Sequence, residues 1–397
     1  MSHQAFIEYI RAFKTLYEGA PKQKKSELLD QAEQLTRKDR KTVIRYLGRK
    51  LNESDLRSTQ DGRGRPIEYD PEVLLPHVKR LWIAMERIGS HRMKVALKDW
   101  LPFYEHEDFT DEIAIKLELM SKGTLERMVA SLRKLDQVNK GLPTTTSALR
   151  AMKNRIPINT LDSKIDRPGF TQADTVAHCG MSAAGKFLST LTLTDIASTW
   201  TENRAIAGKT GIKVRDSFID LRKSLPFELL AINTDSGSEF LNNHVIHFMD
   251  SWYHKKQITF TRSRPYHKND NAYVEQKNYT HVRQLFGYER LEEEGLVELM
   301  NEIYVHYWNP LHNFFLPTQK LKEKTREGAK LIKKFDEPRT PYARLLESKH
   351  LSQERKDKLL ATRQALNPFA LAKGLEERLK IFYQLQKQYK MNQREAA

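Results

Sequence analysis

The apolar pattern of this chain changes at about residue 168, from the spacing of helices to the two-residue alternation of β-strands. Residues 170–178 are strand-like, and residues 187–195 alternate apolar side chains with serine and threonine. A third strand is expected over residues 199–206. Five further segments alternate in kind: helix 209–224, strand 228–234, helix 243–256, strand 257–261 and helix 271–286. Three strands followed by alternating helices and strands predict a mixed α/β layered domain.

Three acidic residues lie within the strands and helices of this predicted domain or directly at their ends. Asp174 lies in the middle of the first strand, and Asp235 lies where a short buried strand ends. Glu275 lies one turn into a helix. Ligands bind at the carboxyl edges of strands in α/β sheets, and hard divalent cations prefer carboxylate oxygens. We therefore predict that the three acids hold two Mg²⁺ or Mn²⁺ ions. Taken singly, each acid could instead be a turn cap or a surface charge.

The charge balance indicates the kind of partner. The 397 residues carry a formal net charge of +16, and the sequence pI is about 9.6. Such a surplus favours nucleic acid, because cations that neutralise phosphates release counterions; a basic but unrelated enzyme is the alternative. No apolar run approaches 18 residues, so no transmembrane helix is expected. The single cysteine, Cys179, excludes an internal disulfide framework and fits a reducing compartment.

The first 60 residues are predicted to be helical. Ser26 is the expected N-cap of one helix, and a basic amphipathic helix is expected over residues 36–51. A helix, a short turn and a basic helix match a helix-turn-helix DNA-binding module, whose second helix enters the major groove. A plain helical pair with a solvated basic face is the alternative. The candidate DNA-contacting residues are Arg37, Lys38, Arg40, Lys41 and Arg45.

Residues 61–145 are predicted to form a second helical module behind a linker. Arg63 and Arg65 lie beside glycines and are candidates for contact with a phosphate backbone or a minor groove, or else belong to a simple linker. Ser121 marks the start of a helix that exposes Arg127. This segment predicts either another helix-turn-helix unit or a helical spacer. The earlier helices are expected over residues 73–88, 90–101 and 112–120.

The end of the chain is expected to be helical and basic. Residues 290–315 form an aromatic helical segment that Asn309-Pro310 should end. From Thr318 the chain is predicted to be basic and helical, and residues 369–397 form an amphipathic helix.

Two longer strings around the acids resemble a known family. Residues 233–240 (NTDSGSEF) and 265–275 (PYHKNDNAYVE) resemble the second and third acidic motifs of DDE transposases of bacterial insertion sequences. These enzymes share their catalytic core with retroviral integrases. Residues 169–178 and 190–195 resemble the first acidic strand of that family and the strand after it. The resemblance covers about residues 168–315 and extends more weakly to the N-terminal helices.

The resemblance implies an RNase H-like core in which Asp174, Asp235 and Glu275 bind two metal ions. It implies magnesium-dependent nicking of DNA ends, followed by attack of the freed 3′-hydroxyl on target DNA. The sequence departs from the retroviral relatives where lysines contact DNA, because Tyr279 and Val282 stand there. Lys277 and Arg283 are the candidate replacements.

Together these inferences predict a transposase of four parts: a helix-turn-helix module at 1–60, a second helical module at 61–145, the catalytic core at 160–316 and a basic helical region at 317–397. The expected partners are double-stranded DNA and further copies of the chain, as a homodimer or a larger assembly, without a membrane. The expected location is cytoplasmic, with the bacterial nucleoid. A nuclease of the same fold without strand transfer, and a non-catalytic DNA-binding regulator, are the alternatives.

Overall fold

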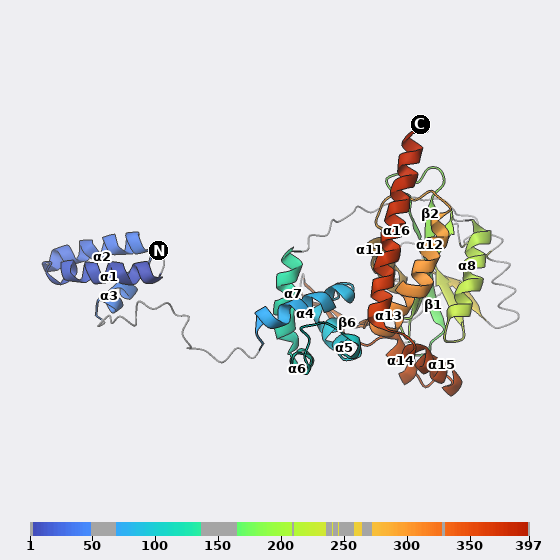
Figure 1. Cartoon of the computed structure of the whole chain (residues 1–397), viewed down its shortest axis with the longest axis horizontal. Helices are drawn as coiled ribbons and strands as arrows, with labels where there is room; N and C mark the ends of the chain where they lie inside the picture. Colours follow the sequence, from blue (N-terminus) through green and yellow to red (C-terminus); the bar gives the residue numbers. More distant parts are fainter. Residues whose placement is uncertain are drawn as a thin grey trace. The chain divides into compact units, whose positions relative to one another are not determined.

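The computed structural model describes residues 3–48, 69–135, 165–208, 210–235, 240, 245, 258–263, 272–327 and 330–395. The chain divides into two compact units, Met1–Glu68 and Tyr69–Ala397. Within the described residues, no helix is long and apolar enough to cross a membrane. Figure 1 labels the elements along the chain.

The first unit contains three helices, α1 (His3–Glu18), α2 (Lys22–Thr36) and α3 (Arg40–Leu47). Their buried residues include Phe6, Ile10 and Val43. The turn between α2 and α3 is short because Arg37 adopts a left-handed conformation that ends α2 and Asp39 caps α3, accepting a hydrogen bond from the Thr42 amide at 2.9 Å. The predicted basic helix over 36–51 is therefore wrong at its start.

The prediction that Ser26 caps a helix is also wrong. Helix α2 begins at Lys22, directly after Pro21, whose φ of −65° already suits a helix start. The Ser26 hydroxyl instead accepts a hydrogen bond from Arg40 at 2.7 Å. Ser26 thus ties α2 to α3.

The second unit opens with α4 (Pro71–Ala84), α5 (Ser90–Trp100), α6 (Asp111–Leu119) and α7 (Lys122–Leu135), which confirms the predicted helices. A short 3₁₀ turn, η2 (Leu101–Phe103), follows α5. These helices share one hydrophobic core with the helices that follow the sheet. The Trp100 indole donates to the Phe315 carbonyl at 3.2 Å. The helices expected to form a separate module at 61–145 are thus packed into the same unit as the sheet.

The sheet of the second unit has five strands in the order β3-β2-β1-β4-β5. Strands β1 (Phe170–Ala177), β2 (Leu188–Asp195) and β3 (Thr201–Ala207) are antiparallel neighbours. Strands β4 (Ala231–Thr234) and β5 (Thr259–Arg262) run parallel to β1. Each strand lies within about three residues of its predicted place. The mixed α/β core is confirmed.

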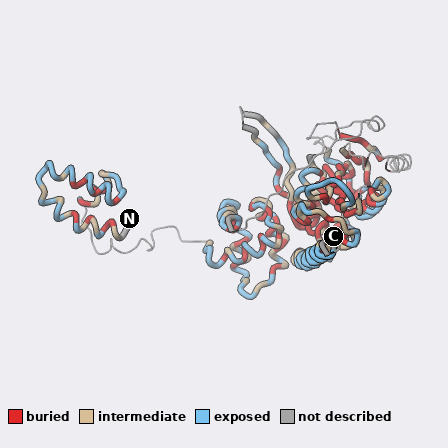
Figure 2. The backbone as a smooth tube through the Cα atoms, turned by 90° about the horizontal axis from the view of Figure 1, so that it is seen from above, coloured by how far each residue is buried: buried red, intermediate tan, exposed pale blue. Residues whose placement is uncertain are grey.

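Helices cover both faces of this sheet. Helix α8 (Gly211–Ser224) packs on one face through Val214, Phe218 and Leu221, against Leu191 and Leu193 of β2. The other face is covered by the helical run that follows the sheet (Figure 1). That run comprises α10 (Ala272–Lys277), η3 (Asn278–Arg283), α11 (Gln284–Phe286), α12 (Leu296–Glu302), η4 (Ile303–Trp308) and α13 (Asn309–Phe315). Figure 2 shows buried backbone concentrated between these layers.

The predicted helix end at Asn309-Pro310 is wrong. Pro310 lies at the start of α13, and the helical path continues through it from α12 to Phe315. The preceding turn, η4, is a π-helix, whose wider hydrogen-bond spacing accommodates a residue without an amide hydrogen.

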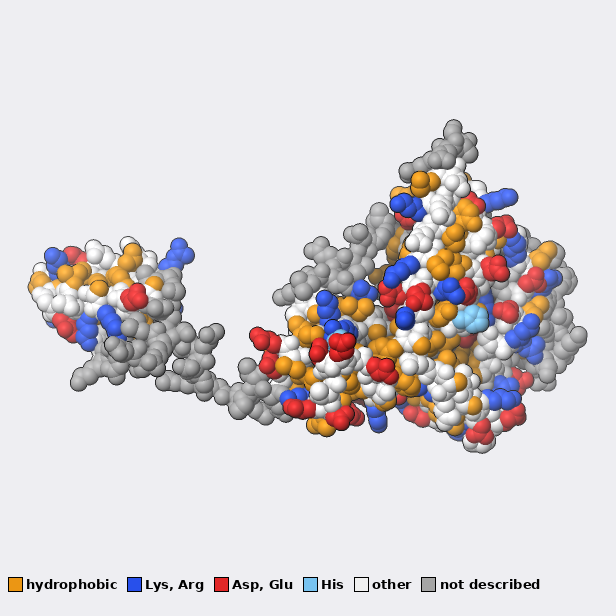
Figure 3. Space-filling model, viewed as in Figure 1, with side chains coloured by type: hydrophobic (Ala, Val, Ile, Leu, Met, Phe, Trp, Pro, Cys, Tyr) orange, Lys and Arg blue, Asp and Glu red, His pale blue; other side chains and the backbone are white. Residues whose placement is uncertain are grey.

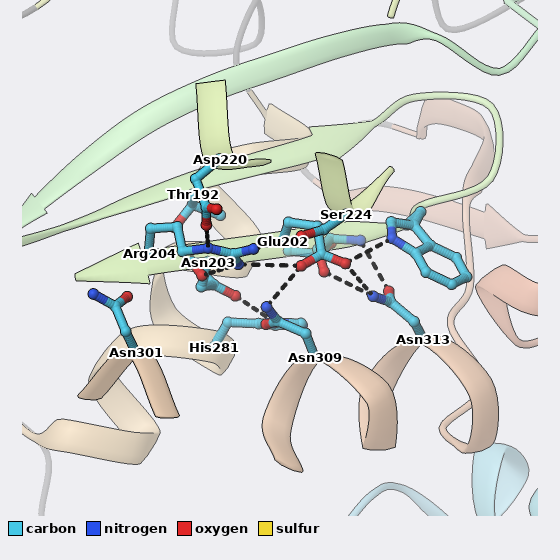
Figure 4. A network of polar contacts seen from close by, with 12 residues as sticks. Thr192, Glu202, Asn203, Arg204, Asp220, Ser224, His281, Asn301, Asn309 and Asn313 are labelled. Carbon is cyan, nitrogen blue, oxygen red and sulfur yellow. Dashed lines mark hydrogen bonds and ion pairs between the residues drawn. The ribbon is translucent and has the colours of Figure 1, made fainter. Parts of the chain in front are cut away.

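Edge strand β3 is closed by side chains from the helices beneath it (Figure 4). The Asn313 carboxamide accepts from the Thr201 amide and donates to the Thr201 carbonyl, both at 2.9 Å. Asn301 makes the same pair of contacts with Ala205, at 2.8 and 3.0 Å. Two carboxamides thus take the place of a neighbouring strand, which protects the edge from other chains.

A buried acid next to this edge is held by several donors. The Glu202 carboxylate accepts from Trp200 and Asn309, each at 2.9 Å, and pairs with Arg204 at 3.3 Å. Arg204 also reaches α8, where it contacts Asp220 and Ser224, each at 2.6 Å (Figure 4). Because every charge in the network has partners, its burial is tolerated.

The region after the core begins with strands. Strands β6 (Leu321–Glu327) and β7 (Lys330–Phe335) form a hairpin, so the predicted helix from Thr318 is wrong there. Helices α14 (Pro341–Glu347), α15 (Gln353–Gln364) and α16 (Pro368–Glu395) complete the chain. The final amphipathic helix is confirmed, and Figure 1 shows it running along the helical layer of the core.

Candidate active site

Asp174 and Asp235 occupy matching positions at one edge of the sheet. Strands β1 and β4 are parallel, and Ala173 is paired with Thr234, so the next residue on each strand is an aspartate. Such neighbours lie on the same face, about 4.8 Å apart across the strands. Both aspartates are partly buried. The backbone of Asp174 therefore lies beside that of Asp235, which directly follows the last residue of β4.

Gln172, two residues before Asp174, holds the helix that carries Glu275. Its side-chain oxygen accepts hydrogen bonds from the amides of Tyr273 and Val274, at 3.2 and 3.3 Å. These amides lie in the first turn of α10, where no partner exists within the helix. Gln172 therefore acts as a helix cap supplied by a strand, and it fixes the start of α10 against β1.

A second contact joins β1 to η3, which directly continues α10. The Asn278 side chain donates to Asp174 Oδ2 at 2.6 Å, and the Thr175 amide donates to Asp174 Oδ1 at 2.7 Å. Residues 273–278 span about 7 Å along a helix, which matches the roughly 7 Å between residues 172 and 174 on a strand. Helix α10 therefore runs alongside β1, with Glu275 between the two points of attachment.

Glu275 itself is exposed. Across the part of the chain that the structure describes, which includes all three acids, no three His, Cys, Asp or Glu side chains form a group able to hold a metal ion. The fold thus makes Asp174 and Asp235 backbone neighbours and attaches the helix of Glu275 to β1, but among the described residues it forms no three-residue ligand group.

The donor set at this edge fits a hard cation. Asp174 and Asp235 offer carboxylate oxygens, and Asn278 supports one of them from outside, as ligand-supporting residues do in metal sites. Glu275 would complete the set from α10. Mg²⁺ binds through few carboxylates and keeps several waters, so the two aspartates are ligands of a suitable type and number for this ion.

A buried group of a lysine and two histidines lies along the same helical run. The Lys277 amine lies 3.4 Å from His281 Nε2, and the ring centroids of His281 and His312 are 4.4 Å apart. Burial, with Arg92 and Arg344 nearby, lowers the pKa of Lys277 to about 7. Burial also holds the pKa of both histidines well below the ordinary value. These histidines are therefore neutral, and His281 binds Asn203 Oδ1 at 3.2 Å.

The two proposed replacements for the retroviral lysines are both partly buried. Lys277 faces His281, and Arg283 donates to the Ala177 carbonyl at 2.9 Å and lies over the Tyr288 ring. Arg283 thus helps to hold the helical run on the sheet, whereas the contact of Lys277 with His281 lies within the run. Whether either also reaches DNA stays a prediction.

The remaining predicted DNA contacts are spread over both units. In the first unit, Arg40 is tied to Asp30 and Ser26, while the other basic candidates are exposed on the turn and on α3: Arg37, Lys38, Lys41 and Arg45. Arg127 is exposed on α7 and donates to Thr124 at 3.2 Å. Arg63 and Arg65 lie outside the described residues. On the face seen in Figure 3, basic and acidic side chains are interspersed.

His178, on the side of β1 that carries Asp174, has a packing role. It is fully buried, bonds Thr190 at 2.9 Å and meets Phe286 edge-on. Burial lowers its pKa to about 3, so the ring is neutral.

Sequence reasoning missed Gln172 as a positioning residue and gave Asn278 no role. Both had a weak signal. Gln172 is a polar residue on the same side of the strand as Asp174, and Asn278 lies one helical turn after Glu275.

Comparison with known proteins gives one clear relative. No family model matches the chain. A curated protein of Sinorhizobium fredii (strain NBRC 101917 / NGR234), the uncharacterized protein y4rM, is 32% identical over 343 residues, which are 85% of this chain and 94% of that protein. The chain belongs to the y4rM family. The name of that relative carries no activity, so membership alone assigns none.

Among solved structures, this member of the y4rM family resembles retroviral integrases only distantly. The catalytic core of BIV integrase is 18% identical, with a TM-score of 0.30, over 46% of this chain and 96% of that one. The HTLV-2 core in complex with magnesium is 21% identical, with a TM-score of 0.24, over 30% and 70%. One chain of a simian T-cell lymphotropic virus intasome complex is 16% identical, with a TM-score of 0.26, over 43% of this chain and 54% of its own length. Scores this low carry no argument about activity.

Proposed function

We propose that this protein is a DNA transposase that nicks the ends of a mobile element and transfers the resulting 3′-hydroxyl groups to target DNA. One observation supports this most: the helix of Glu275 is attached to β1 on both sides of that residue, through Gln172 and through Asp174 itself. In this proposal, the attachment would hold the third acid of the motif close enough to join Asp174 and Asp235. The surplus of positive charge and the resemblance of the acidic motifs support the same proposal.

In this proposal, Asp174, Asp235 and Glu275 hold two Mg²⁺ or Mn²⁺ ions. Ions bound there would supply stabilisation of the attacking and leaving oxygens of a phosphodiester. The protein contributes orientation: Asn278 and the Thr175 amide fix the Asp174 carboxylate, and Gln172 fixes the start of α10. The exposed Glu275 would join the aspartates when metal and DNA are bound.

The N-terminal helices would bind the element ends. The short α2–α3 turn and the exposed cations on α3 fit a helix-turn-helix module, and α6 and α7 offer a second one with Arg127 exposed. Joining two ends requires at least two copies of the chain, so we expect a homodimer or larger assembly on DNA. We expect it to act in the cytoplasm, at the nucleoid.

The proposal is tested by incubating the full-length protein with Mg²⁺, labelled DNA from the flanks of its own gene and a supercoiled plasmid. Labelled strands joined to the plasmid are the expected product. Asp174→Asn and Asp235→Asn should each abolish nicking and joining. Asp357→Asn, the same chemical change on the exposed face of α15, should leave both unchanged.

The outcomes separate the alternatives. Nicks without joined products would assign a nuclease. Specific binding to the flanking DNA without nicking would assign a regulator. Full activity in Asp235→Asn would refute the carboxylate mechanism.

A further inference from the structure

Strands β6 and β7 form an arm rather than part of a larger sheet. They pair only with each other among the described strands. Figure 2 shows a two-stranded ribbon reaching out from the body, with exposed residues along it. Lys322, Lys333 and Lys334 are exposed, and Leu321 and Phe335 at the base are 40% and 51% exposed. A two-stranded hairpin is marginally stable alone, so a projecting one needs support or a partner.

The base of the arm is fixed to the body. Asp336 is buried and accepts from the Lys320 amide at 2.6 Å and from Arg344 of α14 at 2.7 Å. Thr318 and Arg339 exchange two backbone hydrogen bonds, at 2.8 and 3.1 Å. The arm therefore leaves the body in a set direction.

The register separates the charges of the arm. Residues 321–335 contain six Lys or Arg and two Glu. Position 324, a lysine, is paired with Lys333. Position 326, an arginine, is two residues further along the strand, so it lies on the same side of the ribbon as position 324. Both glutamates belong to the other side, where each is opposite a lysine: Glu323 pairs with Lys334 at 2.9 Å, and position 327 is opposite position 330. By this register, the charged residues on one side of the ribbon (the cationic side) are all Lys or Arg, whereas those on the other side (the balanced side) are of both signs.

This arrangement is unfavourable for the hairpin alone. Like charges directly opposite each other destabilise an antiparallel pair. A polyanion lying against positions 324, 326 and 333 removes that repulsion. The shape of the arm selects among polyanions, because the major groove of B-DNA is about 12 Å wide and admits a two-stranded β-ribbon. Each strand is roughly 20 Å long. The hairpin is therefore longer than the major groove is deep, which is about 8.5 Å.

We propose that the β6–β7 hairpin lies in the major groove of duplex DNA, with the cationic side formed by positions 324, 326 and 333 against the phosphates. This inference rests on the proposed function in one respect, which is that the ligand is DNA. It adds a DNA contact of the second unit that is separate from the N-terminal helices.

The test compares two charge-matched variants of the full-length protein. Lys324→Gln with Lys333→Gln removes two cations from the cationic side, and Lys330→Gln with Lys334→Gln removes two from the balanced side. Binding to a fluorescent 40-base-pair duplex is measured without divalent cation over a range of salt concentrations. The first variant should bind about tenfold more weakly, and the slope of log affinity against log salt should fall by about 2, since each phosphate contact contributes about 0.9. The second variant should change the slope by less than about 0.5.

Each other outcome overturns the inference. Equal slopes for wild type and the first variant would show that the arm does not contact DNA, while cleavage by wild type would leave the proposed function intact. Equal losses in both variants would show an effect of net charge only. A changed oligomeric state with unchanged DNA binding would assign the arm to contacts between copies. Absence of DNA binding by wild type would end both proposals.

Discussion

The Asn278 side chain donates a 2.6 Å hydrogen bond to Asp174 Oδ2, across 104 residues of sequence. The contact connects the first acid of the motif to the helix that carries the third. A neutral carboxamide can donate to the carboxylate without competing for a cation. Asn278 therefore orients Asp174 and leaves its charge available.

Replacing Asn278 with Ala should lower activity without unfolding the protein. Removal of a residue that supports a metal ligand typically costs 10–100-fold in metal affinity or activity. We expect nicking by Asn278→Ala to need about tenfold more Mg²⁺, with the maximal rate partly restored at high concentration. A titration of the nicking rate against Mg²⁺ measures this.

The control is Thr280→Ala, two residues later, whose hydroxyl donates to the Gln276 carbonyl at 3.2 Å. Its Mg²⁺ dependence should match wild type. If Asn278→Ala also matched wild type, Asn278 would have no role in orienting the acid.

Gln172→Met should loosen the attachment of α10. Methionine has a similar length but no acceptor, so the amides of Tyr273 and Val274 lose their bonds to residue 172. Leaving a buried donor unsatisfied costs about 1–3 kcal/mol, and of the two bonds that of Val274 is buried while that of Tyr273 is partly buried, so we expect a loss of about 2 kcal/mol. Urea unfolding measures the loss, and amide hydrogen exchange in residues 272–277 should speed up. Unchanged exchange there would contradict the role of Gln172 as a cap.

The sequence predicted the sheet because alternation is visible where one face of a strand is buried, as in β2 with Leu191 and Leu193. The same pattern failed for β6 and β7. Exposed side chains along that hairpin, such as Lys322 and Lys334, remove the alternation on which the prediction depends. The three acids could be identified from their sequence motifs. The strands on which two of them lie could be identified from the predicted order of elements. The contacts of Gln172 and Asn278 could not, because each joins residues about 100 positions apart and depends on the path of α10.

His178 should make the protein less stable in acid. Its pKa is lowered from 6.5 to about 3 by burial, so the unfolded chain binds a proton that the folded chain does not. The stability contributed by the neutral ring is complete above pH 6.5 and is lost as the pH falls toward 3. Between pH 7 and pH 5 this single group should cost about 2 kcal/mol.

The measurement is urea unfolding of wild type and His178→Gln at both pH values. Glutamine stays neutral, so the variant should lose about 2 kcal/mol less than wild type over this range, although it is less stable at pH 7. Because His281 and His312 are also buried and neutral, both proteins should keep a common acid sensitivity. Identical pH dependence in the two proteins would mean that His178 is protonated or exposed in the folded state.

The last prediction concerns the edge of the sheet. Asn313→Leu keeps the number of side-chain heavy atoms but removes both hydrogen bonds to the Thr201 backbone, and Asn313 is 1% exposed, so water cannot replace them. Two unsatisfied buried groups should cost about 2–4 kcal/mol in the free energy of unfolding. Asn301→Leu removes the matching bonds to Ala205 from a partly exposed side chain, so its loss should be smaller, about 1–2 kcal/mol. Because the carboxamides also occupy an edge on which another strand could pair, the Asn313 variant should aggregate faster on mild heating, as light scattering would record. Equal losses in the two variants would show that burial does not determine the loss in the free energy of unfolding. No increase in aggregation would show that the helices beneath β3 protect its edge without the carboxamides.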